Sequence, residues 1–471
     1  MRKKTKIVAT ISDERCDIEF IKALYRAGMN VVRLNTAHQS VNDTVKIINN
    51  VRKVSEKIAL MIDTKGPEIR TTSSDYKITL KKGDTIKVTG NPGSASTPDC
   101  ICVSYSGFVN EVQAGSHILI DDGEIELLIK GKSSEYLICE ATNEGVIKGK
   151  KSVNVPNATF SLPALSEKDK EYIRFAIEHD IDFIAHSFVR NKNDVWEIRK
   201  ILDAHNSRIK IIAKIENQQG VDNLDEILKD VYGIMVARGD LAIEIPYEKI
   251  PGIQKMIINK CIDSRKPVII ATQMLHSMID NPRPTRAEVS DVANAIYGKT
   301  DAIMLSGETA YGNYPVEAVQ TMSRIALEVE KSRSNIHSTP MAILSTHTSA
   351  YLAKSTVEAS IMLDAEAIIA DTTTGRTVRN IAGYRGRKIV YAQCYDKRVV
   401  RELSLSFGVY PQYLNPSASF DFIKAALEGL LKKECLKKTD RIVVLGGNFG
   451  KTHGASFIEI SSLENLMKDS V

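Results

Sequence analysis

Eight short apolar segments recur along this chain, and amphipathic segments with helical periodicity separate most of them. Apolar runs that alternate with helices predict buried parallel strands, and eight is the number of strands that closes a (β/α)8 barrel. We therefore expect the fold class α/β, with a TIM barrel as its main part. The helical periodicity is clear at Ile18–Ala27, Val41–Val54, Asp194–Ala204, Leu224–Leu228 and Pro315–Lys331. The expected strands are Lys6–Thr10, Val31–Leu34, Ala59–Ile62, Phe183–Ala185, Lys210–Ile215, Gly233–Val236, Pro267–Ala271 and Ala302–Leu305.

Polar or charged residues stand where nearly every one of these apolar runs ends. In a (β/α)8 barrel the carboxyl ends of the strands meet at one face, which holds the active site. Ordinary loops do not account for polar chemistry at so many strand ends, so the pattern predicts an enzyme. The residues concerned are Arg33, Asn35, Asp63, Thr64, Lys65, Ser187, Lys214, Glu216, Asp240, Thr272, Gln273, Ser306 and Glu308.

Lys214 and Glu216 stand two residues apart at the end of one expected strand, so their side chains point to the same face. Asp240 follows the end of the next strand along the chain. A cation and two carboxylates aimed together suit a divalent metal ion with a phosphate bound against it. A buried Lys–Glu ion pair that closes a layer of the barrel is the alternative, and this pair alone does not decide between the two.

The barrel pattern is interrupted after Pro67, where alternating, turn-rich sequence continues to about Asn154. Period-two alternation with tight turns predicts a small antiparallel β domain inserted into the third βα loop. An insertion at the active-site end is placed to act as a lid, although a passive decoration is the alternative. Its expected strands are Tyr76–Leu80, Thr85–Thr89, His117–Ile120, Ile125–Ile129 and Tyr136–Cys139.

A second interruption, Ser332–Ser349, is polar and without periodicity and is typical of a linker. Beyond it, strands alternate with helices again and indicate a separate α/β domain of a usual size. We expect a barrel domain at residues 1–68 and 155–332, a cap domain at residues 69–154 and a C-terminal domain at residues 345–471. The strands expected in the C-terminal domain are Ala367–Asp371, Lys388–Cys394, Val409–Leu414 and Arg441–Leu445.

Length, charge and cysteines restrict the class of protein. The chain has 471 residues, a size that fits about three domains. Its net charge of +5 is small for this length and no long basic block occurs, so nucleic acid is not expected as a partner. No apolar stretch is long enough for a signal peptide or a membrane span. The seven cysteines form no C-x-x-C pair and are expected to be free thiols of a cytoplasmic protein.

Six segments, in order along the chain, closely resemble the pyruvate kinase family. The resemblance is collinear from Lys6 to about Ile325 and looser beyond. It implies a β-barrel cap beside the TIM barrel, a C-terminal α/β domain and a homotetramer. It also implies transfer of the phosphoryl group of phosphoenolpyruvate to ADP, giving pyruvate and ATP, as the last step of glycolysis, with Mg²⁺ or Mn²⁺ and with K⁺. The segments are Ile62–Arg70, Ile211–Asn217, Ile234–Pro246, Ala271–Leu275, Pro282–Glu288 and Ile303–Ala310.

The resemblance gives roles to the residues at the strand ends. Lys214 is the expected catalytic ammonium on the transferring phosphoryl group, and Arg33 matches the phosphate-binding arginine. Glu216 and Asp240 are the expected Mg²⁺ ligands, and Asp240 also binds substrate. Thr272 resembles the substrate-contacting threonine and is expected to orient a water molecule, because a hydroxyl is a poor acid. The backbone N–H of Gly239 is expected to hold the substrate carboxylate, with simple turn chemistry as the alternative.

Nucleotide binding is expected beside the two hinges of the cap. Arg70 and Lys151 match the residues that contact ADP phosphates, and closure of the cap would bring their charge to the nucleotide. Asn35 and His38 are placed near the nucleotide as well, although a single histidine is as often structural.

For K⁺, the matching ligands are Asn35, Asp63 and Thr64. Ala37 replaces the serine usual in the family, so one oxygen ligand is missing and weaker K⁺ binding is expected. Glu68 is retained, and an acidic residue there accompanies K⁺ dependence in the family. Other departures from the family pattern remove no named catalytic group; they are Ala242, His276 and Tyr311.

A loop in the C-terminal domain resembles the family's effector loop and follows an expected strand directly. Hydroxyls, a glycine and an arginine at a helix start form a plausible phosphate site, with ordinary helix capping as an equal alternative. A phosphorylated metabolite is the expected effector, and its residues are Thr372, Thr374, Arg376 and Thr377.

Two other glycine- or hydroxyl-containing motifs are given structural interpretations. Thr285 and Glu288 have the spacing of a capping box and predict a helix start. Gly446–Thr452 looks like a P-loop, but its glycines are one residue too close, and we reject a second nucleotide site.

Three classes of function remain open from sequence. A phosphotransferase of the pyruvate kinase type is favoured. A metal-dependent lyase or aldolase could use the same carboxylates, but Arg70 and Lys151 argue against it. A regulatory relative without catalytic activity is suggested only by the departures from the family pattern.

Overall fold

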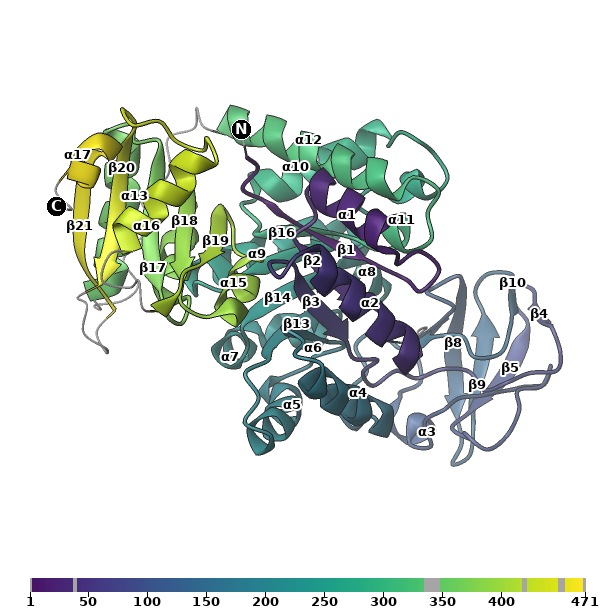
Figure 1. The fold of residues 1–471 in the computed structure, drawn as a ribbon. Helices are drawn as coiled ribbons and strands as arrows, with labels where there is room; N and C mark the ends of the chain where they lie inside the picture. The colour runs from purple at the N-terminus through teal and green to yellow at the C-terminus, as the bar shows by residue number, and fades with distance from the viewer. Residues whose placement is uncertain (1, 37–39, 334–347, 417–421, 448–453, 469–471) are drawn as a thin grey trace.

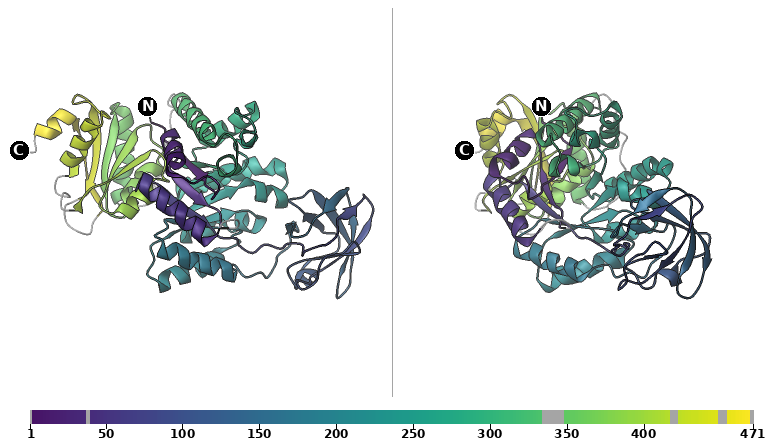
Figure 2. Two further views of the ribbon diagram at one scale, coloured as in Figure 1. Left: turned by 45° about the vertical axis from the view of Figure 1, so that its right-hand side comes forward. Right: turned by 90° about the vertical axis from the view of Figure 1, so that its right-hand side faces the viewer.

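The computed structural model describes residues 2–36, 40–333, 348–416, 422–447 and 454–468. In Figures 1 and 2 the chain forms three bodies in a row. A central barrel lies between a β-rich cap (strands β4 to β11) and a C-terminal part (helices α13 to α17 with their sheet). Ala37 and His38 lie outside the described residues.

The central body is a closed barrel of eight parallel strands in the order β1-β16-β15-β14-β13-β12-β3-β2. The (β/α)8 prediction is confirmed, and every expected strand is found with its ends within one residue of those observed. The strands are β1 Lys6–Thr10, β2 Val31–Leu34, β3 Ala59–Asp63, β12 Phe183–His186, β13 Lys210–Ile215, β14 Gly233–Ala237, β15 Val268–Ala271 and β16 Ala302–Leu305.

Two apolar layers hold the barrel together. Its interior is filled by fully buried side chains such as Val31, Phe183 and Ile269, so the barrel is packed and has no pore. A second cluster joins the outward faces of the strands to the surrounding helices. The helices are α1 Ile18–Ala27, α2 Val41–Val54, α4 Glu167–Glu178, α5 Lys192–Ala204, α6 Gln218–Asp222, α7 Leu224–Asp230, α8 Arg238–Glu244, α9 Ile250–Asp263, α10 Arg286–Tyr297, α11 Gly307–Ala310 and α12 Pro315–Arg333, with short 3₁₀ helices at Tyr247–Lys249 and His276–Ile279.

Local capping explains where several of these helices begin. Asp17 and Ser40 accept backbone N–H groups at the starts of α1 and α2. The predicted capping box of Thr285 and Glu288 is confirmed at the start of α10. Glu288 also accepts the N–H of Ser277 at 2.7 Å, so this motif ties α10 to the preceding 3₁₀ turn.

The cap contains a six-stranded sheet in the order β11-β7-β8-β9-β5-β6 and a two-stranded sheet, β10-β4. Arg70 pairs with Ser152 beside β11, and Thr71 pairs with Val103 just after β6. The entering segment therefore bridges both edges of the larger sheet and draws it around a separate apolar core. The strands are β4 Ile78–Leu80, β5 Thr85–Thr89, β6 Cys100–Cys102, β7 His117–Ile120, β8 Ile125–Lys132, β9 Leu137–Ala141, β10 Gly145–Ile147 and β11 Val153–Asn154, and a short helix, α3, spans Phe108–Glu111.

Sequence periodicity missed three cap strands, namely β6, β10 and β11. Each has only two or three residues, which is too short to display an alternation of buried and exposed side chains.

The C-terminal part is a five-stranded sheet in the order β19-β18-β17-β20-β21, of which only β21 is antiparallel. The four expected strands are present, but β21 was not expected. It lies at the edge of the sheet and most of its residues are only partly buried, so it forms no apolar run. The strands are β17 Ala367–Thr372, β18 Ile389–Cys394, β19 Val409–Tyr413, β20 Arg441–Gly447 and β21 Ala455–Ser462, and the helices are α13 Thr348–Met362, α14 Arg376–Gly383, α15 Lys397–Leu403, α16 Phe422–Lys432 and α17 Leu463–Lys468.

The C-terminal part packs against the N-terminal ends of the barrel strands. Arg401 Nε donates to Asp182 at 2.6 Å just before β12, and Arg385 forms a two-pronged ion pair with Asp301 just before β16. The interior of the barrel is covered at this end by Leu405. The opposite end, where the polar strand ends lie, faces away from the C-terminal part.

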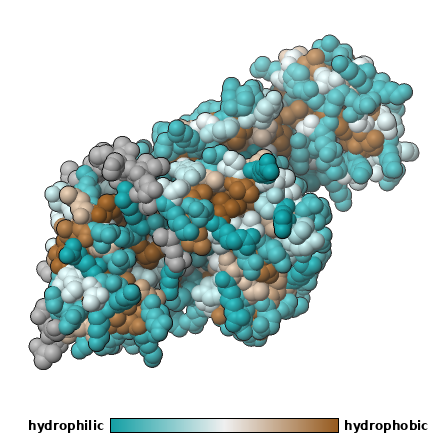
Figure 3. Space-filling view, turned by 90° about the horizontal axis from the view of Figure 1, so that it is seen from above, coloured by the Kyte–Doolittle hydropathy of each residue, from teal (hydrophilic) through white to brown (hydrophobic). Residues whose placement is uncertain are grey.

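The surface is mainly hydrophilic on the face shown in Figure 3, with small hydrophobic patches and a smaller lobe that projects from the main body. No helix in the described parts of the chain is long and apolar enough to cross a membrane. All seven cysteines are free, and five of them are buried.

Candidate active site

Lys214 lies at the centre of the charged residues that gather at the carboxyl ends of the strands. Its ammonium is 2.8 Å from Glu216 Oε1 and 3.4 Å from Asp63 Oδ2. It also donates a hydrogen bond of 2.8 Å to Ser187 Oγ. Residues from β3, β12 and β13 are thus brought together around one cation, as the strand-end pattern predicted.

Arg33, at the end of β2, is held in place by the same carboxylate. Its Nε and Nη2 atoms donate to Asp63 Oδ1 and Oδ2 at 3.1 and 2.7 Å, and Nη1 donates to Thr10 Oγ1 at 3.2 Å. A two-pronged arginine–carboxylate pair fixes the plane of the guanidinium. Asp63 therefore positions both cations of the site.

These opposite charges stabilise one another and offset the cost of burying them. Burial lowers the pKa of Lys214, but the carboxylates of Glu216 and Asp63 outweigh it, so the pKa lies above its usual value. Burial raises the pKa of Asp63, but Arg33 and Lys214 outweigh it and the net shift is downward. Lys214 stays protonated and Asp63 stays ionised.

Glu216 and Asp240 are the carboxylates that could hold a divalent metal ion. Glu216 Oε2 accepts the backbone N–H of Phe188 at 2.6 Å, and Oε1 lies 2.8 Å from the ammonium of Lys214. Burial raises the pKa of Glu216 to about 7, with Lys214 opposing and Asp240 adding to the shift. A buried carboxylate beside a second carboxylate fits a hard cation.

The described residues contain no cluster of three or more His, Cys, Asp or Glu side chains that could enclose a metal ion. Two carboxylates are nevertheless a usual protein contribution to Mg²⁺, which takes its other ligands from water and substrate phosphates. The donor set therefore fits Mg²⁺ in a site completed by substrate.

Thr272 and Gly239 are brought together where β15 and β14 end. The N–H of Gly239 donates to Thr272 Oγ1 at 2.8 Å, and that hydroxyl donates to the carbonyl of Ala271 at 2.6 Å. Thr272 has a φ of 67°, a conformation that is uncommon for a threonine. Arg238 holds this turn, because Nη2 donates to the Thr272 carbonyl at 2.7 Å while Nη1 pairs with Asp291 at 2.7 Å.

The residues expected to bind K⁺ lie in the same region. Asn35 follows β2 directly and Asp63 ends β3. The carbonyl of Thr64 accepts a hydrogen bond of 2.8 Å from Ser187 Oγ, and the carbonyl of Asp63 accepts one from Thr36. The structure thus brings Asp63 and Thr64 beside Lys214, while the replacement at Ala37 falls outside the described residues.

Ser187 and His186, at the end of β12, form a support that sequence reasoning did not assign. Ser187 accepts from Lys214 and donates to Thr64, and its N–H donates to Thr64 Oγ1 at 3.1 Å. His186 Nδ1 lies 3.0 Å from the same Thr64 hydroxyl, and burial lowers the pKa of this histidine to about 4. The sequence offered one signal for this support, namely a histidine at the end of a buried apolar run.

The two residues expected at the cap hinges each have an acidic partner. Arg70 pairs with Glu68 at 2.7 Å and donates to the carbonyl of Lys150 at 2.7 Å. Lys151 contacts both carboxylate oxygens of Asp121, at 2.7 and 2.8 Å. Neither cation is fully buried, so both can exchange these partners for a phosphate.

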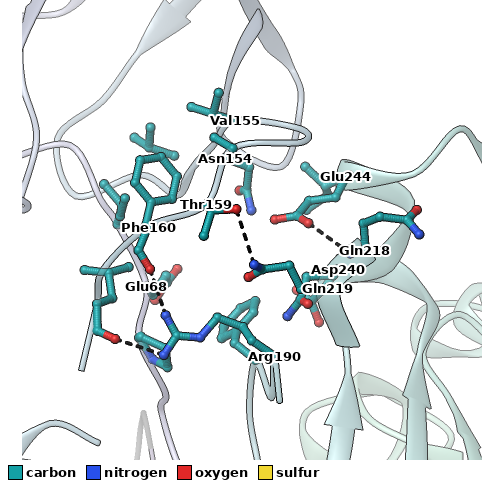
Figure 4. Close-up of a pocket in the computed structure, with 18 of the residues that line it drawn as sticks. Glu68, Asn154, Val155, Thr159, Phe160, Arg190, Gln218, Gln219, Asp240 and Glu244 are labelled. Carbon is teal, nitrogen blue, oxygen red and sulfur yellow. Dashed lines mark hydrogen bonds between the residues drawn. The ribbon is translucent and has the colours of Figure 1, made fainter. Parts of the chain in front are cut away.

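A cavity of about 400 Å³ lies between the cap and the barrel and reaches Asp240 (Figure 4). Asn154 borders it from the cap, while Glu68, Phe160, Gln219 and Glu244 border it from the barrel. Gln219 donates to Thr159 Oγ1 at 3.3 Å across it. Its volume is in the range of small-molecule sites.

Glu308, which follows the last barrel strand, supports the loops around the site. Glu308 accepts the N–H groups of Ser306 and Leu275, at 2.8 and 3.1 Å. It therefore ties the loop after β16 to the loop after β15 and does not point its carboxylate at the charged cluster.

The expected effector loop turns tightly into α14. Thr372 Oγ1 accepts the N–H of Gly375 at 2.9 Å, and Gly375 has a φ of 78°. Gly375 is the N-cap residue of α14 and makes no side-chain capping hydrogen bond of its own. Thr372 and Thr377 are buried, whereas Thr374 and Arg376 are exposed.

Two family models match most of the chain. Residues 2–319 match pyruvate kinase, barrel domain, and residues 351–461 match pyruvate kinase, alpha/beta domain. A pyruvate kinase from Borreliella burgdorferi is 48% identical over 472 residues, covering 99% of this chain and 98% of the relative. One from Bacillus licheniformis is 44% identical over 469 residues, covering 97% of this chain and 80% of the relative.

A solved structure agrees with these relatives. The crystal structure of a pyruvate kinase from Cryptosporidium parvum matches with a TM-score of 0.90 and 36% identity, covering 98% of this chain and 96% of that one. Fold, sequence and the charged cluster at the strand ends lead to one conclusion: the chain belongs to the pyruvate kinase family.

Proposed function

We propose that this protein transfers the phosphoryl group of phosphoenolpyruvate to ADP, giving pyruvate and ATP. The observation that carries the proposal is the ammonium of Lys214, fixed between Glu216 and Asp63 at the carboxyl end of the barrel. Phosphoryl transfer needs positioned positive charge and little covalent work from the protein. Family membership supplies the two substrates.

Lys214 and Arg33 bind the phosphoryl group that moves. Both are held by Asp63, so their charges are oriented before substrate arrives and need no rearrangement during transfer. Lys214 and Arg33 can therefore both donate to the same phosphoryl group. The negative charge of that group spreads over its oxygens as the bond to the leaving oxygen breaks.

Glu216 and Asp240 would hold Mg²⁺ or Mn²⁺. When bound, this ion neutralises phosphate charge and orients substrate oxygens. The closeness of the two carboxylates supports this role, because Asp240 disfavours the charged form of the buried Glu216 and a bound cation would offset that repulsion.

Thr272 and Gly239 bind the substrate beside the metal ligands. The hydroxyl of Thr272 already accepts one N–H and donates to a carbonyl, so it does not itself supply the proton to the enolate carbon. We assign to it the orientation of a water molecule that does so. The substrate carboxylate can accept the hydrogen bond of the Gly239 N–H once the Thr272 hydroxyl has rotated away from it.

For the nucleotide, Arg70 and Lys151 contact the ADP phosphates, with Asn35 and His38 nearby. Both hinge cations exchange a carboxylate partner, Glu68 or Asp121, for phosphate oxygens when the cap closes. The cap domain is proposed as residues 69–154, between barrel segments 1–68 and 155–332, with a C-terminal domain at 345–471.

These boundaries have a direct test. A chain with Thr71–Lys150 replaced by a short linker should keep a folded barrel, because the cap has its own core. Its activity should be lost, since neither hinge cation keeps its framework. A cooperative unfolding transition of the purified variant, measured by circular dichroism, would show that its barrel is folded. A variant that is unfolded throughout would count against the boundaries.

K⁺ is proposed as a second cation, bound by Asn35, Asp63 and Thr64. Because Ala37 offers no oxygen, half-activation by K⁺ should need a higher concentration than in an Ala37→Ser variant. Equal rates of the wild type with and without K⁺ would remove this proposal.

The loop Thr372, Thr374, Arg376 and Thr377 is proposed to bind a phosphorylated effector. Its arginine lines a cavity of about 470 Å³ that also contains Arg265, Lys266 and Arg379, and this basic lining supports an anionic ligand. Arg376→Ala should abolish activation and leave the unactivated rate nearly unchanged. Coupling between sites is typically about 1–3 kcal/mol, a several-fold to hundredfold change in half-saturation.

We further propose that the protein is a homotetramer in the cytoplasm and acts in glycolysis, as its resemblance to the family implies. Light scattering of the purified chain tests the assembly.

A coupled assay of pyruvate formation tests the function itself. Activity should require phosphoenolpyruvate, ADP and a divalent metal ion together. Pyruvate release that does not depend on ADP would indicate lyase chemistry instead, and no turnover with any divalent ion would indicate a regulatory relative. Either result overturns the proposal.

A further inference from the structure

One arginine of the barrel holds the segment through which the chain returns from the cap. Arg190 lies between β12 and α5, and its side chain is 15% exposed. Its Nη1 and Nη2 atoms donate to the carbonyls of Phe160 and Leu162, at 3.0 and 2.9 Å. Figure 4 shows Arg190 beside the backbone of Phe160. We call residues 160–162 the return segment.

The barrel alone fixes the position of the Arg190 guanidinium. Nε and Nη2 donate to the two carboxylate oxygens of Asp194, each at 3.0 Å, and the backbone N–H of Arg190 donates to the same carboxylate at 2.9 Å. Asp194 lies in the first turn of α5 and its side chain is 7% exposed. Because a two-pronged pair fixes the plane of a guanidinium, the donors that remain point at the return segment in a set direction.

The return segment is bound to the cap on its other side. The ring of Phe160 stacks on that of Phe108, with ring centres 5.6 Å apart, and meets the ring of Tyr105 edge-on at 6.0 Å. The N–H of Ser161 donates to Glu111 Oε2 at 3.0 Å, and Glu111 Oε1 accepts the Tyr105 hydroxyl at 2.9 Å. Phe160 lies beyond the proposed end of the cap, yet it packs against the apolar core of the cap. The segment is therefore fastened to both bodies.

The two hinge cations belong to the cap. Lys151 forms two hydrogen bonds with Thr71, because its N–H donates to the Thr71 hydroxyl at 2.9 Å and its carbonyl accepts the Thr71 N–H at 2.8 Å. Arg70 pairs with Ser152 in the neighbouring bridge. The position of both cations over the barrel therefore depends on how the segments that cross between the two bodies are held.

We propose that Arg190 is a positioning residue for phosphoryl transfer, because it fixes the point about which the cap turns when it closes. The inference rests on the proposed function, in which Arg70 and Lys151 contact the ADP phosphates. A segment that is bonded to both bodies moves little relative to either, so rotation of the cap is centred on it. Arg190 itself touches neither substrate; it determines where the two hinge cations arrive.

This role separates the two substrates. Lys214 and Arg33, which are proposed to bind the phosphoryl group, stand on barrel strands and stay in place when the cap is tilted. Lys151 and Arg70 are displaced with the cap. A misplacement of about 1 Å in a positioned group can cost on the order of 100-fold in rate. Loss of the anchor should therefore weaken the use of ADP and leave the use of phosphoenolpyruvate.

Arg190→Lys tests the proposal in the full chain. The lysine keeps a positive charge beside Asp194, so the buried carboxylate is not left alone, but one ammonium cannot replace the fork that also reaches two carbonyls. The half-saturating concentration of ADP should rise about tenfold or more, whereas that of phosphoenolpyruvate should change by less than about twofold. The coupled assay of pyruvate formation measures both concentrations, and urea unfolding checks that the variant is folded.

Arg52→Lys is the matched control. Arg52 also joins a buried aspartate to a backbone carbonyl, since it pairs with Asp182 at 3.2 Å and donates to the carbonyl of Ile58 at 2.7 Å, but it lies at the opposite end of the barrel. Both half-saturating concentrations should stay at their wild-type values in this variant. A similar rise for ADP in Arg52→Lys and Arg190→Lys would mean that Arg190 acts through general stability, and would overturn the proposal.

Glu111→Ala breaks the bond to the return segment from the cap side and should raise the half-saturating concentration of ADP as well. In the double variant with Arg190→Lys the two increases should not multiply, because both changes break one connection. Increases that multiply, an unchanged value for ADP in Arg190→Lys, or equal increases for ADP and phosphoenolpyruvate would each overturn the inference while the wild type stays active. A wild type that forms no pyruvate would overturn the proposed function and this inference with it.

Discussion

The two ends of the barrel shift the pKa of a buried lysine in opposite directions. At the carboxyl end, Lys214 lies between Glu216 and Asp63, and its pKa lies above the usual value. At the other end, Lys6 has a backbone carbonyl and an aromatic ring as neighbours, and burial lowers its pKa to about 7. The surroundings, and not the residue type, decide whether a buried ammonium keeps its proton.

The difference bears on what each end can do. Around Lys214 the cations and carboxylates nearly balance, so the charges are fixed in place without substrate and the catalytic cation is always present. Around Lys6 the direct contacts are neutral, and the carboxylates of Glu330 and Asp301 favour its charged form without outweighing burial. The first arrangement suits catalysis, whereas the second joins the start of β1 to β19.

The largest expected effect comes from removing the paired lysine. Lys214→Met should reduce phosphoryl transfer by on the order of 10³-fold or more, the scale of losing a donor that stabilises the transition state. Steady-state kcat in the coupled assay measures it. The affinity for Mn²⁺, measured by electron paramagnetic resonance, should change much less because both carboxylates remain. A variant within about tenfold of the wild-type rate would contradict the assigned role.

Next in size is a loss of stability at the opposite end. Arg385 and Asp301 are both 3% exposed in their side chains, so Arg385→Ala leaves a buried carboxylate without its main partner. It should destabilise the fold by about 3 kcal/mol or more, measured by urea unfolding, with little change in the rate per folded molecule. Arg208→Ala, which removes a side chain that is 55% exposed and pairs with Asp396 across the same interface, should cost less than about 1 kcal/mol. Equal costs would show that burial does not govern this interface.

A smaller effect is expected from a hydroxyl that positions Lys214. Ser187→Ala removes the acceptor of the Lys214 ammonium and the donor to Thr64, and should lower kcat about tenfold, or about 1.4 kcal/mol. Lys214 keeps its carboxylates, so the loss stays below that of removing the ammonium. Ser404→Ala is the control, because Ser404 makes two hydrogen bonds at the other end of the barrel, to the carbonyls of Lys57 and Val400. Similar losses in both variants would mean that Ser187 acts only through general stability.

Much of this fold could be predicted because local patterns in the sequence indicate it. The eight barrel strands are fully buried, so each appears as a continuous apolar run, and the charged residues at their ends identify the site face. The cap strands β6, β10 and β11 and the edge strand β21 could not be found this way. They are too short or too exposed to show a regular alternation of apolar and polar residues in the sequence.

Contacts between distant segments were also beyond the sequence. Nothing local indicates that Asp63 holds Arg33 and Lys214 together, or that Asp121 and Glu68 occupy the hinge cations. The cavity of about 510 Å³ between the barrel and the C-terminal part is lined by the first residues of the chain and by residues beyond 400, so no single motif reveals it. Tertiary packing creates these features.

The last expected effect, which appears only when pH is varied, is a dependence of stability on pH that Lys6 alone produces. The groups that face it are Glu330 and Asp301, which favour its charged form, and Arg2 and Lys3, which oppose it together with burial. Its pKa is about 7 in the folded chain, whereas the pKa of a lysine exposed to water is 10.5. Between these values the unfolded chain holds the proton and the folded chain does not, so folding gains as pH rises.

The stability of the wild type relative to Lys6→Met should therefore increase between about pH 7 and pH 10 and should level off below that window. Urea unfolding of both proteins at several pH values measures the difference, in which contributions of other groups cancel. A difference that stays constant with pH would show that Lys6 is charged and compensated within the protein, and the contrast with Lys214 would then disappear.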